Sequence, residues 1–307
     1  MNTKYAIVIT TYNREHLLRE CIEKVNAQTI PPEIILIVNN ASTDGTYEYI
    51  EGLPARDSRY IIINLSKNIG GAGGFAKGIE AVINKCVDCV LLIDDDAMLS
   101  EDYMQQILYA RQNNPQYRAF AGTVWSNGKI DTSHRKNFSR IGLLQKPIEV
   151  DAYNKPYFAC DAASFCGMLV DMEIIRLVGV PHAEYFIWQD DAEYSLRIKK
   201  HTLFLNVTEA KLTHRTNPPQ LSGKRRYDWR EYYAVRNRIL MVREHGNICD
   251  RIVNSIDLFI HVVFRNWLFG LLKKDNYNWE YEKYLVKEAI TNANSSSLQN
   301  IIIKRKE

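Results

Sequence analysis

Four short segments in the first third of the chain are almost continuously hydrophobic. They are YAIVIT at 5–10, IILIV at 34–38, YIIINL at 60–65 and CVLLI at 89–93. A strand that is covered on both faces carries apolar side chains on both faces. Continuous runs of this length therefore predict buried strands of a parallel sheet.

Between these strands the apolar positions change to helical spacing. Residues three or four apart are apolar in two segments, namely Leu17, Leu18, Cys21, Ile22 and Val25, and then Phe75, Ile79, Val82 and Ile83. Strands that alternate with helices predict an α/β fold, in which a mainly parallel sheet has helices on both faces and right-handed crossovers. Ligands of such sheets bind at the carboxyl ends of the strands. Those ends are polar or glycine-rich and are expected to line one crevice: TTYNR, NNASTDGT, SKNIGGAGG and DDDAML.

The rest of the chain divides into a less regular middle and a helical end. ASFCGMLVD and LFLNVTEAKLTH are predicted strands, and a helix is predicted to begin near WQDDAEYSLRIKK. Turn residues at 216–228 predict a loop, and helices are predicted at 230–245, 252–274 and 279–293. We therefore divide the chain into an α/β domain at 1–215 and a loop and helical region at 216–307.

The overall composition is ordinary, but the charge is unevenly distributed. At 46% hydrophobic and 24% charged, the 307 residues suit a globular protein with an ample core. Residues 216–307 hold 16 of the 39 Lys and Arg and 10 of the 36 Asp and Glu, a net charge of +6 that leaves −3 for the first 215 residues. The basic end predicts contact with something anionic.

Cysteine usage and the N-terminus both favour a cytosolic protein. Cys86 and Cys89 form one pair without a second pair or a nearby histidine at zinc spacing, so the six cysteines are interpreted as buried, reduced thiols. The N-terminal apolar run is too short for a signal peptide, and a first strand explains it better.

The most apolar segment of the helical end is SIDLFIHVVFRNWLFGLL at 255–272. Asp257, His261 and Arg265 are four residues apart and would form one polar stripe, which argues against a membrane-spanning helix. An interfacial amphipathic helix is one interpretation, since Lys273 and Lys274 follow it. A helix packed on the protein's own core is supported equally well.

Three adjacent aspartates, Asp94, Asp95 and Asp96, follow the fourth predicted strand. Adjacent carboxylates repel one another unless a divalent cation removes the repulsion, and hard oxygen ligands suit Mg²⁺ or Mn²⁺. The alternative is an acidic helix N-cap, for which one aspartate would suffice. A metal that holds phosphates implies a nucleotide. NIGGAGGF at 68–75 would allow close backbone approach to a ligand, although it is neither a G-x-G-x-x-G segment nor a phosphate loop.

These segments together resemble a known family. VITTYNRE, IVNNASTDGT, NIGGAGGFAKGI, LLIDDDAML, IWQDDAEYSLRI and LTHR occur in the order and approximate spacing of the inverting glycosyltransferases of family 2, which have the GT-A fold. They span residues 5–215. The glycine-rich segment and the three aspartates are most similar to the galactofuranosyltransferase branch, with rhamnosyltransferase-like relatives of bacterial surface-polysaccharide synthesis close behind.

The resemblance implies a UDP-sugar site at the strand ends. Thr10 and Tyr12 would lie near the base and Arg14 near the diphosphate. Asn39 stands where the family usually has an aspartate that pairs with uracil, and an amide can both accept from N3–H and donate to a carbonyl. The other residues expected around the donor are Asn68, Gly73, Gly74, Asp94 and Asp95.

The resemblance also implies a metal site and a catalytic base. Asp94, Asp96 and His214 would hold Mn²⁺ or Mg²⁺, and Asp95 would face the ribose or the donor sugar. Asp191 would accept the proton that the acceptor hydroxyl loses as the new bond forms, although an acidic helix N-terminus explains Asp191 equally well from the residues alone. Residues expected to contact donor or acceptor sugar are Trp188, Asp190, Glu193, Phe165, Cys166 and Gly167.

Three further groups of residues have no settled role. Arg236 and Asn237 match a common element that follows the catalytic domain, but the sequence gives no physical reason for it. Lys224, Arg225 and Arg226 would either close over the diphosphate or form a solvated basic loop. Trp125, His134 and Arg135 lie in a region at 125–165 that is expected to decide sugar specificity.

The expected function is inverting, metal-dependent transfer of a sugar to a hydroxyl of a growing, lipid-linked bacterial surface polysaccharide. The favoured donor is UDP-galactofuranose, and rhamnosyl or other hexosyl transfer is the alternative. The protein would be cytoplasmic and peripheral at the inner membrane face, held by its C-terminal helices. Two rivals are a non-catalytic nucleotide-sugar scaffold and a nucleotidyltransferase, which would need a basic glycine-rich loop after the first strand.

Overall fold

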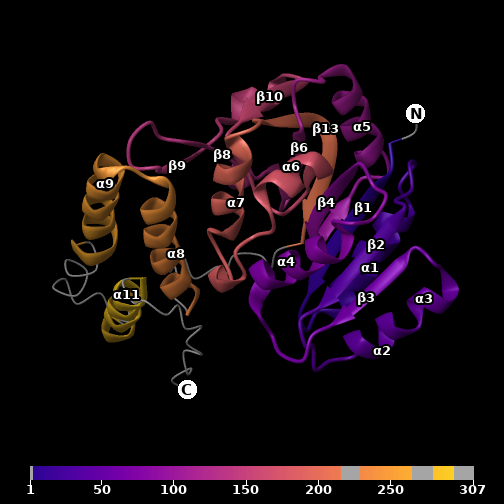
Figure 1. Cartoon of the computed structure of the whole chain (residues 1–307), viewed down its shortest axis with the longest axis horizontal. Coiled ribbons are helices and arrows are strands. Elements are labelled where there is room, and N and C mark those ends of the chain that lie inside the picture. Colours follow the sequence, from indigo (N-terminus) through magenta and orange to yellow (C-terminus); the bar gives the residue numbers. More distant parts are fainter. Residues whose placement is uncertain (1–2, 216–228, 265–278, 294–307) are drawn as a thin grey trace. The chain divides into compact units, whose positions relative to one another are not determined.

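The protein is described here by a computed structural model, which covers residues 3–215, 229–264 and 279–293 (Figure 1). It contains two compact units, each described by itself. The first comprises Met1–Asn137, Lys146–Ala183 and Asp191–Pro218, and the second comprises Phe138–Gln145, Glu184–Asp190 and Pro219–Glu307. Two short segments from the first 215 residues thus pack with the C-terminal helices. The sequence placed the division at residue 215, and that boundary stays a prediction.

A ten-stranded sheet forms the centre of the first unit. Its strand order is β10-β13-β6-β12-β4-β1-β2-β3, with β5 beside β13 and β7 beside β6. The four predicted apolar strands are all present, as β1 (Tyr5–Thr11), β2 (Ile34–Asn39), β3 (Tyr60–Asn64) and β4 (Cys89–Asp94), and their mutual pairings are parallel. The predicted α/β class with a mainly parallel sheet is confirmed.

The remaining strands extend this sheet or form a small second one. β12 pairs antiparallel with both β4 and β6, whereas β13 pairs parallel with β6. The strands that extend the large sheet are β5 (Ala97–Leu99), β6 (Ala119–Ser126), β7 (Lys129–Ile130), β10 (Tyr157–Cys160), β12 (Met168–Asp171) and β13 (Phe204–His214). The second sheet has the order β11-β8-β9 and consists of β8 (Arg135–Phe138), β9 (Gln145–Pro147) and β11 (Ala162–Ala163).

Helices cover both faces of the large sheet, which explains why its strands are apolar throughout. Along β1, Tyr5, Ile7 and Ile9 pack in the core that includes α1 and α5, whereas Ala6 and Val8 pack in the core that includes α4, α6 and α7. Each buried aliphatic side chain contributes about 1.5–3 kcal/mol. The helices of this unit are α1 (Glu15–Asn26), α2 (Thr46–Glu51), α3 (Leu53–Arg56), α4 (Gly70–Val82), α5 (Tyr103–Asn113), α6 (Met172–Val178) and α7 (Asp190–Lys199).

The second unit is a helical bundle. α8 (Arg230–His245) and α11 (Trp279–Ala293) have the predicted bounds and share an apolar core that includes Tyr232, Tyr233 and Leu285. The helix predicted at 252–274 begins earlier, as α9 (Ile248–Leu258), because Asn247 and Asp250 form a capping box. The chain continues as a π-helix at Phe259–Phe264, and the rest of that prediction lies outside the described residues.

No helix in the described parts of the chain combines the length and the apolar character needed to cross a membrane.

Candidate active site

β1 and β4 end side by side where the strand order reverses. The chain runs from β1 outward to β2 and β3, and then returns so that β4 pairs with the other side of β1. Thr10 at the end of β1 lies in register with Asp94 at the end of β4. Open α/β sheets bind ligands outside the carboxyl ends of their strands at such a switch point. The segments TTYNR and DDDAML therefore meet at one site, as predicted.

Two side chains from the β1 end hold the aspartate cluster. Thr11 Oγ1 donates a hydrogen bond of 2.8 Å to Asp95 Oδ2. Arg14 Nη1 lies 3.1 Å from Asp95 Oδ1 and 2.6 Å from Asp96 Oδ2, so one guanidinium bridges two carboxylates. Asp95 and Asp96 are buried, whereas about half of the Arg14 side chain is exposed. Without a metal, Arg14 supplies the positive charge that offsets the repulsion among these carboxylates.

β13 brings His214 to the cluster from a distant part of the chain. The strand pairs antiparallel with β5, so that His214 lies opposite Ala97, immediately after the third aspartate. His214 Nε2 is 3.1 Å from Asp96 Oδ1, and the backbone N–H of Arg215 donates to the Asp96 carbonyl. The predicted association of His214 with the aspartates is therefore present in the structure.

Burial and mutual repulsion raise the pKa values of two of the three carboxylates. Burial, with a contribution from Asp96, raises the pKa of Asp94 to about 7, and burial raises the pKa of Asp95 to about 6. Burial would also raise the pKa of Asp96, but His214 and Arg14 outweigh it and lower that pKa. The neighbouring Asp96 raises the pKa of His214 against the effect of burial. Asp94 and Asp95 therefore hold their protons more tightly than exposed aspartates do.

The chemistry of this cluster fits a divalent metal. Among the described residues, Asp94 has no hydrogen-bond or ion-pair partner for its carboxylate, and it faces the electrostatic field of Asp96 and His214. His214 Nδ1 is buried and makes no hydrogen bond within the described part of the chain, and the nearest described partner of Asp96 Oδ1 is His214 Nε2 at 3.1 Å. Carboxylate oxygens with one imidazole nitrogen are a donor set for Mn²⁺ or Mg²⁺. The metal roles of Asp94, Asp96 and His214 stay predictions that this arrangement favours.

A second histidine, which the sequence left without a role, lies beside the first. The rings of His134 and His214 meet edge to face with centroids 5.1 Å apart. His134 Nδ1 is 2.7 Å from Ser164 Oγ, and its Nε2 is 3.6 Å from Asp131 Oδ2. Burial lowers the pKa of His134, so the neutral ring is favoured next to His214. Nothing in the local sequence of His134 indicated this position.

Arg135, the next residue, is fully buried and donates to backbone oxygens around the site. Its guanidinium contacts the carbonyls of Gly122, His134 and Cys166, as well as Asn206 Oδ1. These contacts tie β8 to β6 and to the segment after β11, which fixes the backbone that carries His134.

The residues predicted for the nucleotide base differ in accessibility. Tyr12 is exposed and Thr10 is buried. Asn39 is buried at the end of β2, where its Nδ2 donates to Asn64 Oδ1 and its Oδ1 accepts from the Ser42 N–H. Both ends of this amide are thus used within the protein, so contact with a uracil ring would require it to exchange partners. The base-binding roles stay predictions.

The glycine-rich segment opens α4, as predicted, and its glycines allow close packing. A Cβ on Gly74 would lie 2.8 Å from Thr10 Cγ2, and one on Gly73 would lie 2.7 Å from Ile69 Cγ1. Asn68 Oδ1 accepts from the Gly70 N–H and starts the turn into the helix. The structure thus gives Gly74 a packing role against β1 and Gly73 one against Ile69, and their predicted contact with the donor stays a prediction.

The segment predicted to floor the sugar site belongs to the core next to the aspartates. Phe165 is buried and packs against Phe75, with ring centroids 4.6 Å apart. Cys166 is buried, and Gly167 has a φ of +84° that suits glycine. The Gly167 carbonyl accepts from the Tyr103 hydroxyl. Contact of Phe165, Cys166 and Gly167 with a sugar stays a prediction.

α7 begins at the acidic pair, as predicted, and its carboxylates have different environments. Asp191 is only half-buried, so its carboxylate can be reached from the solvent. Its Oδ1 accepts from the Ala192 N–H. Asp190 is buried. Glu193 is fully buried, and both of its oxygens accept from Arg197 in a two-point ion pair of 2.7 and 2.8 Å. A role for Glu193 in binding acceptor would require that pair to open.

The segment just before α7 has an unusual backbone. Phe186, Trp188 and Gln189 have φ values of 63°, 62° and 67°, in the left-handed region that residues other than glycine rarely adopt. Such residues cost on the order of 1–3 kcal/mol each and persist where surrounding contacts hold them. Trp188 is 40% exposed, so its ring is available to a ligand. The contacts that hold this segment come from Arg236 and Asn237 of α8.

The cations at 224–226 that the sequence singled out lie outside the described residues.

The sequence profile of Glycosyl transferase family 2 matches residues 6–177, which is more than half of the chain. The chain belongs to glycosyl transferase family 2. It is 23% identical over 256 residues to galactofuranosyltransferase GlfT1 of Mycolicibacterium smegmatis, covering 78% of this chain and 83% of that protein. It is 25% identical over 260 residues to dTDP-rhamnosyl transferase RfbF of Shigella flexneri, covering 80% and 82%. The predicted resemblance to family 2 is confirmed, and the protein is a glycosyltransferase.

Solved structures of glycosyltransferases share the fold. Staphylococcus aureus TarS in complex with UDP-GlcNAc matches with a TM-score of 0.58 and 14% identity, over 95% of this chain and 80% of that one. GalNAc-T7 with UDP, GalNAc and Mn²⁺ matches with a TM-score of 0.63 and 11% identity, over 94% and 55%. At these identities the likeness establishes the GT-A fold of the family 2 enzyme and no more.

Proposed function

We propose that this family 2 glycosyltransferase moves a sugar from a nucleotide diphosphate to an acceptor hydroxyl with inversion, in the synthesis of a bacterial surface polysaccharide. The observation that carries the proposal is the aspartate cluster at the switch point, where Arg14 and His214 meet three carboxylates. A divalent cation bound there would stabilise the negative charge of the departing diphosphate. The half-exposed Arg14 side chain would bind the same diphosphate by charge.

The acceptor side of the reaction is assigned to the start of α7. Asp191 would take the proton of the incoming hydroxyl, and Trp188 would offer its exposed ring to the apolar face of a sugar. Thr11 would keep Asp95 oriented toward the donor through its hydroxyl. No residue in this scheme forms a covalent bond with the sugar, so one displacement inverts the anomeric centre.

Asp191→Asn tests the base assignment. The amide cannot accept the proton, so kcat should fall by about 10²–10⁴-fold with donor binding nearly unchanged. Glu184→Gln is the matched control, since it removes a carboxylate that lies seven residues before Asp191. Turnover is measured with Mn²⁺ by mass spectrometry of the product. Transfer by Asp191→Asn at the wild-type rate would count against the scheme.

We favour UDP-galactofuranose as donor, with dTDP-rhamnose as the second candidate. Both rest on relatives of similar identity and coverage, named as a galactofuranosyltransferase and a dTDP-rhamnosyl transferase. Because the Asn39 side chain already binds Asn64 and Ser42, it gives no reason to prefer a uracil base to a thymine base in the donor. A panel of UDP- and dTDP-sugars, assayed with and without EDTA, decides the donor and the metal dependence together. Activity that EDTA leaves intact would contradict the metal-dependent mechanism.

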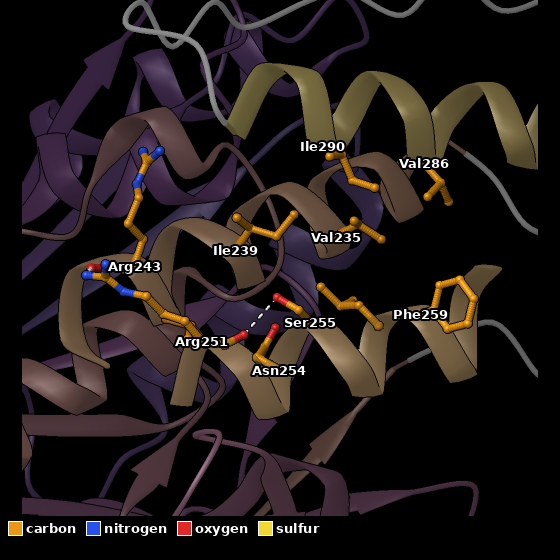
Figure 2. Close-up of a pocket in the computed structure, with 11 residues that line it drawn as sticks. Val235, Ile239, Arg243, Arg251, Asn254, Ser255, Phe259, Val286 and Ile290 are labelled. Atoms are coloured by element: carbon orange, nitrogen blue, oxygen red, sulfur yellow. Dashed lines mark hydrogen bonds between the residues drawn. The ribbon is translucent and has the colours of Figure 1, made fainter. Parts of the chain in front are cut away.

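We also propose that the second unit contacts the inner membrane face and a lipid-linked acceptor. One side of α9 and the π-helical turn after it carries exposed apolar side chains at helical spacing: Ile248, Ile252, Ile256, Phe259, Ile260 and Phe264. Between α8, α9 and α11 lies a pocket of about 410 Å³ with apolar walls (Figure 2). Arg243 and Arg251 stand at one end of the pocket and Phe259 at the other.

The charge at this pocket suits an anionic amphiphile. Arg243 and Arg251 donate to the carbonyls of Ala293 and Arg243, and neither has a carboxylate partner within the described residues. A phosphate bound to either guanidinium group, with an alkyl chain along the apolar wall, would match both the charge and the apolar lining of this pocket. Flotation with vesicles that contain anionic lipid tests the surface. Ile252→Glu with Ile256→Glu should release the protein, whereas Leu177→Glu, an exposed position of the first unit, should not. Equal binding of all variants would contradict this proposal.

A further inference from the structure

The segment 184–189, which leads into α7, is held by one amide side chain. Asn237 Nδ2 donates to the carbonyls of Tyr185, Ile187 and Trp188 at 2.8, 3.0 and 2.7 Å. Asn237 is fully buried in α8. Two amide hydrogens thus serve three carbonyls from a stretch of four residues, so both donors of this buried side chain are directed at the segment.

Arg236 fixes the orientation of that amide. Its Nε donates to Asn237 Oδ1 at 2.9 Å, so the oxygen faces Arg236 and the NH₂ group faces the segment. Its Nη2 contacts the carbonyls of Glu184 and Tyr185. The guanidinium lies over the Tyr233 ring, with its carbon 4.8 Å from the centroid. The two side chains therefore direct all of these donors to the backbone of 184–188 and to each other.

The contacts coincide with the left-handed residues. Phe186 lies between Tyr185 and Ile187, whose carbonyls Asn237 binds. Trp188 offers the third of these carbonyls, and Gln189 follows it directly. A backbone in the left-handed region turns its carbonyls in directions that a regular helix or strand would not present. The donors of Arg236 and Asn237 match that set of directions, so they favour the left-handed conformation over the alternatives.

We propose that Arg236 and Asn237 are positioning residues, which hold segment 184–189 in its left-handed conformation, from which the chain continues directly into α7. Asp191 is the second residue of that helix, and Trp188 belongs to the held segment itself. The two residues would act on transfer through the backbone and without touching a substrate. The consequence for transfer rests on the proposed function, whereas the hold on the segment does not.

Two variants test the contributions of Asn237 and Arg236 separately. Asn237→Asp keeps the size of the side chain but replaces the donor with an acceptor, which would face three carbonyls. Arg236→Lys keeps a positive charge but loses the fork that binds both Asn237 and the backbone, so its effect should be milder. Arg238→Ala is the matched control, because Arg238 is the next residue of α8 and pairs instead with Asp257.

The first measurement is limited chymotrypsin digestion, read by mass spectrometry for cuts after Tyr185, Phe186 and Trp188. We expect Asn237→Asp to be cut there at least tenfold faster than wild type, Arg236→Lys to be intermediate, and Arg238→Ala to be unchanged. Thermal midpoints of all variants are recorded, so that general loss of stability is distinguished from local release. Wild-type resistance of 184–189 in both Asn237→Asp and Arg236→Lys would overturn the proposal.

The second measurement is kinetic. With a productive donor, Asn237→Asp should lower kcat at least tenfold and raise the KM of the acceptor, while the affinity for UDP by calorimetry stays within twofold. A merely structural role predicts parallel losses in UDP binding and transfer that track the thermal midpoint, and that result would overturn the positioning role. Arg238→Ala should change neither. If wild type transfers no sugar from any donor, the proposed function fails, and the digestion still decides whether the segment is held.

Discussion

The three aspartates after β4 differ in their partners, and this difference assigns them different tasks. Asp95 is bound by Thr11 and Arg14, so its orientation is fixed. Asp96 lies between Arg14 and His214. In contrast, no described side chain forms a hydrogen bond or ion pair with the carboxylate of Asp94. Asp94 is therefore the carboxylate whose ionisation depends most on an added cation.

We expect Asp94→Asn and Asp96→Asn each to weaken Mn²⁺ binding at least tenfold, because each removes a charged oxygen that no neighbour replaces. Titration calorimetry in the presence of UDP measures the affinity. Asp102→Asn is the control, since its carboxylate accepts from Ser100 and Gln106 in a neighbouring turn. Unchanged Mn²⁺ affinity in both test variants would place the metal elsewhere.

The sequence identified this cluster but not all of its neighbours. The hydroxyl that contacts Asp95 belongs to Thr11, whereas the sequence singled out Thr10, because the two threonines are indistinguishable until the alternation of β1 is known. Nothing in the sequence placed His134 beside His214, since a histidine in an irregular segment belongs to no periodic pattern. Its approach to His214 depends on how β8 and β13 are brought together.

At the scale of elements, α4 shows how glycines set the distance between a helix and the sheet. A Cβ on Gly78 would lie 2.2 Å from Val8 Cγ1 in the centre of β1, so α4 can approach this closely only without a side chain there. Gly71, in the first turn of the same helix, has open space around its Cβ position. α4 thus contains a glycine that close packing requires, Gly78, and one that a larger residue can replace, Gly71.

Gly78→Ala should destabilise the protein by about 1–3 kcal/mol, because the added methyl group forces Val8 or the helix to move. Gly71→Ala should leave stability unchanged or raise it by up to about 1 kcal/mol, since alanine favours a helix and nothing obstructs it. Urea denaturation of the two variants checks the contrast. Equal loss of stability in both would contradict the close packing of α4 on β1.

Element types were predictable where the pattern was long and regular. α8 and α11 have the predicted bounds, and the four apolar strands are all present. The start of α9 was predicted four residues late, because the capping box of Asn247 and Asp250 begins the helix before its apolar periodicity starts. The left-handed residues before α7 could not be predicted, since none is a glycine and a distant helix holds them.

At the scale of the whole molecule, the burial of the aspartate cluster, together with repulsion among its carboxylates, has an electrostatic cost that folding must overcome. The pKa of Asp94 is raised to about 7 and that of Asp95 to about 6 in the folded protein, against about 3.9 in an unfolded chain. The folded state therefore binds more protons than the unfolded state between about pH 4 and pH 7. Stability is then lost as pH rises through this window.

We expect the thermal midpoint in EDTA to fall between pH 5 and pH 7.5, and to fall less in Asp94→Asn, which carries no ionisable group there. Mn²⁺ should raise the midpoint more at pH 7.5 than at pH 5, because protons compete with the metal for the same carboxylates. Differential scanning calorimetry measures both. A midpoint that rises with pH in EDTA would contradict the raised pKa values of Asp94 and Asp95.

The sequence by itself determined the α/β class, the positions of the buried strands along the chain and the residues that gather at their carboxyl ends. It could do so because burial on both faces leaves a continuous apolar run, and parallel strands place their ends at one edge. Tertiary structure alone decided which side chains hold those residues in place: Thr11 on Asp95, His134 beside His214, and Asn237 on the segment before α7. These contacts join segments up to 84 residues apart. They depend on directions of side chains and carbonyls that exist only once the strands and helices have packed.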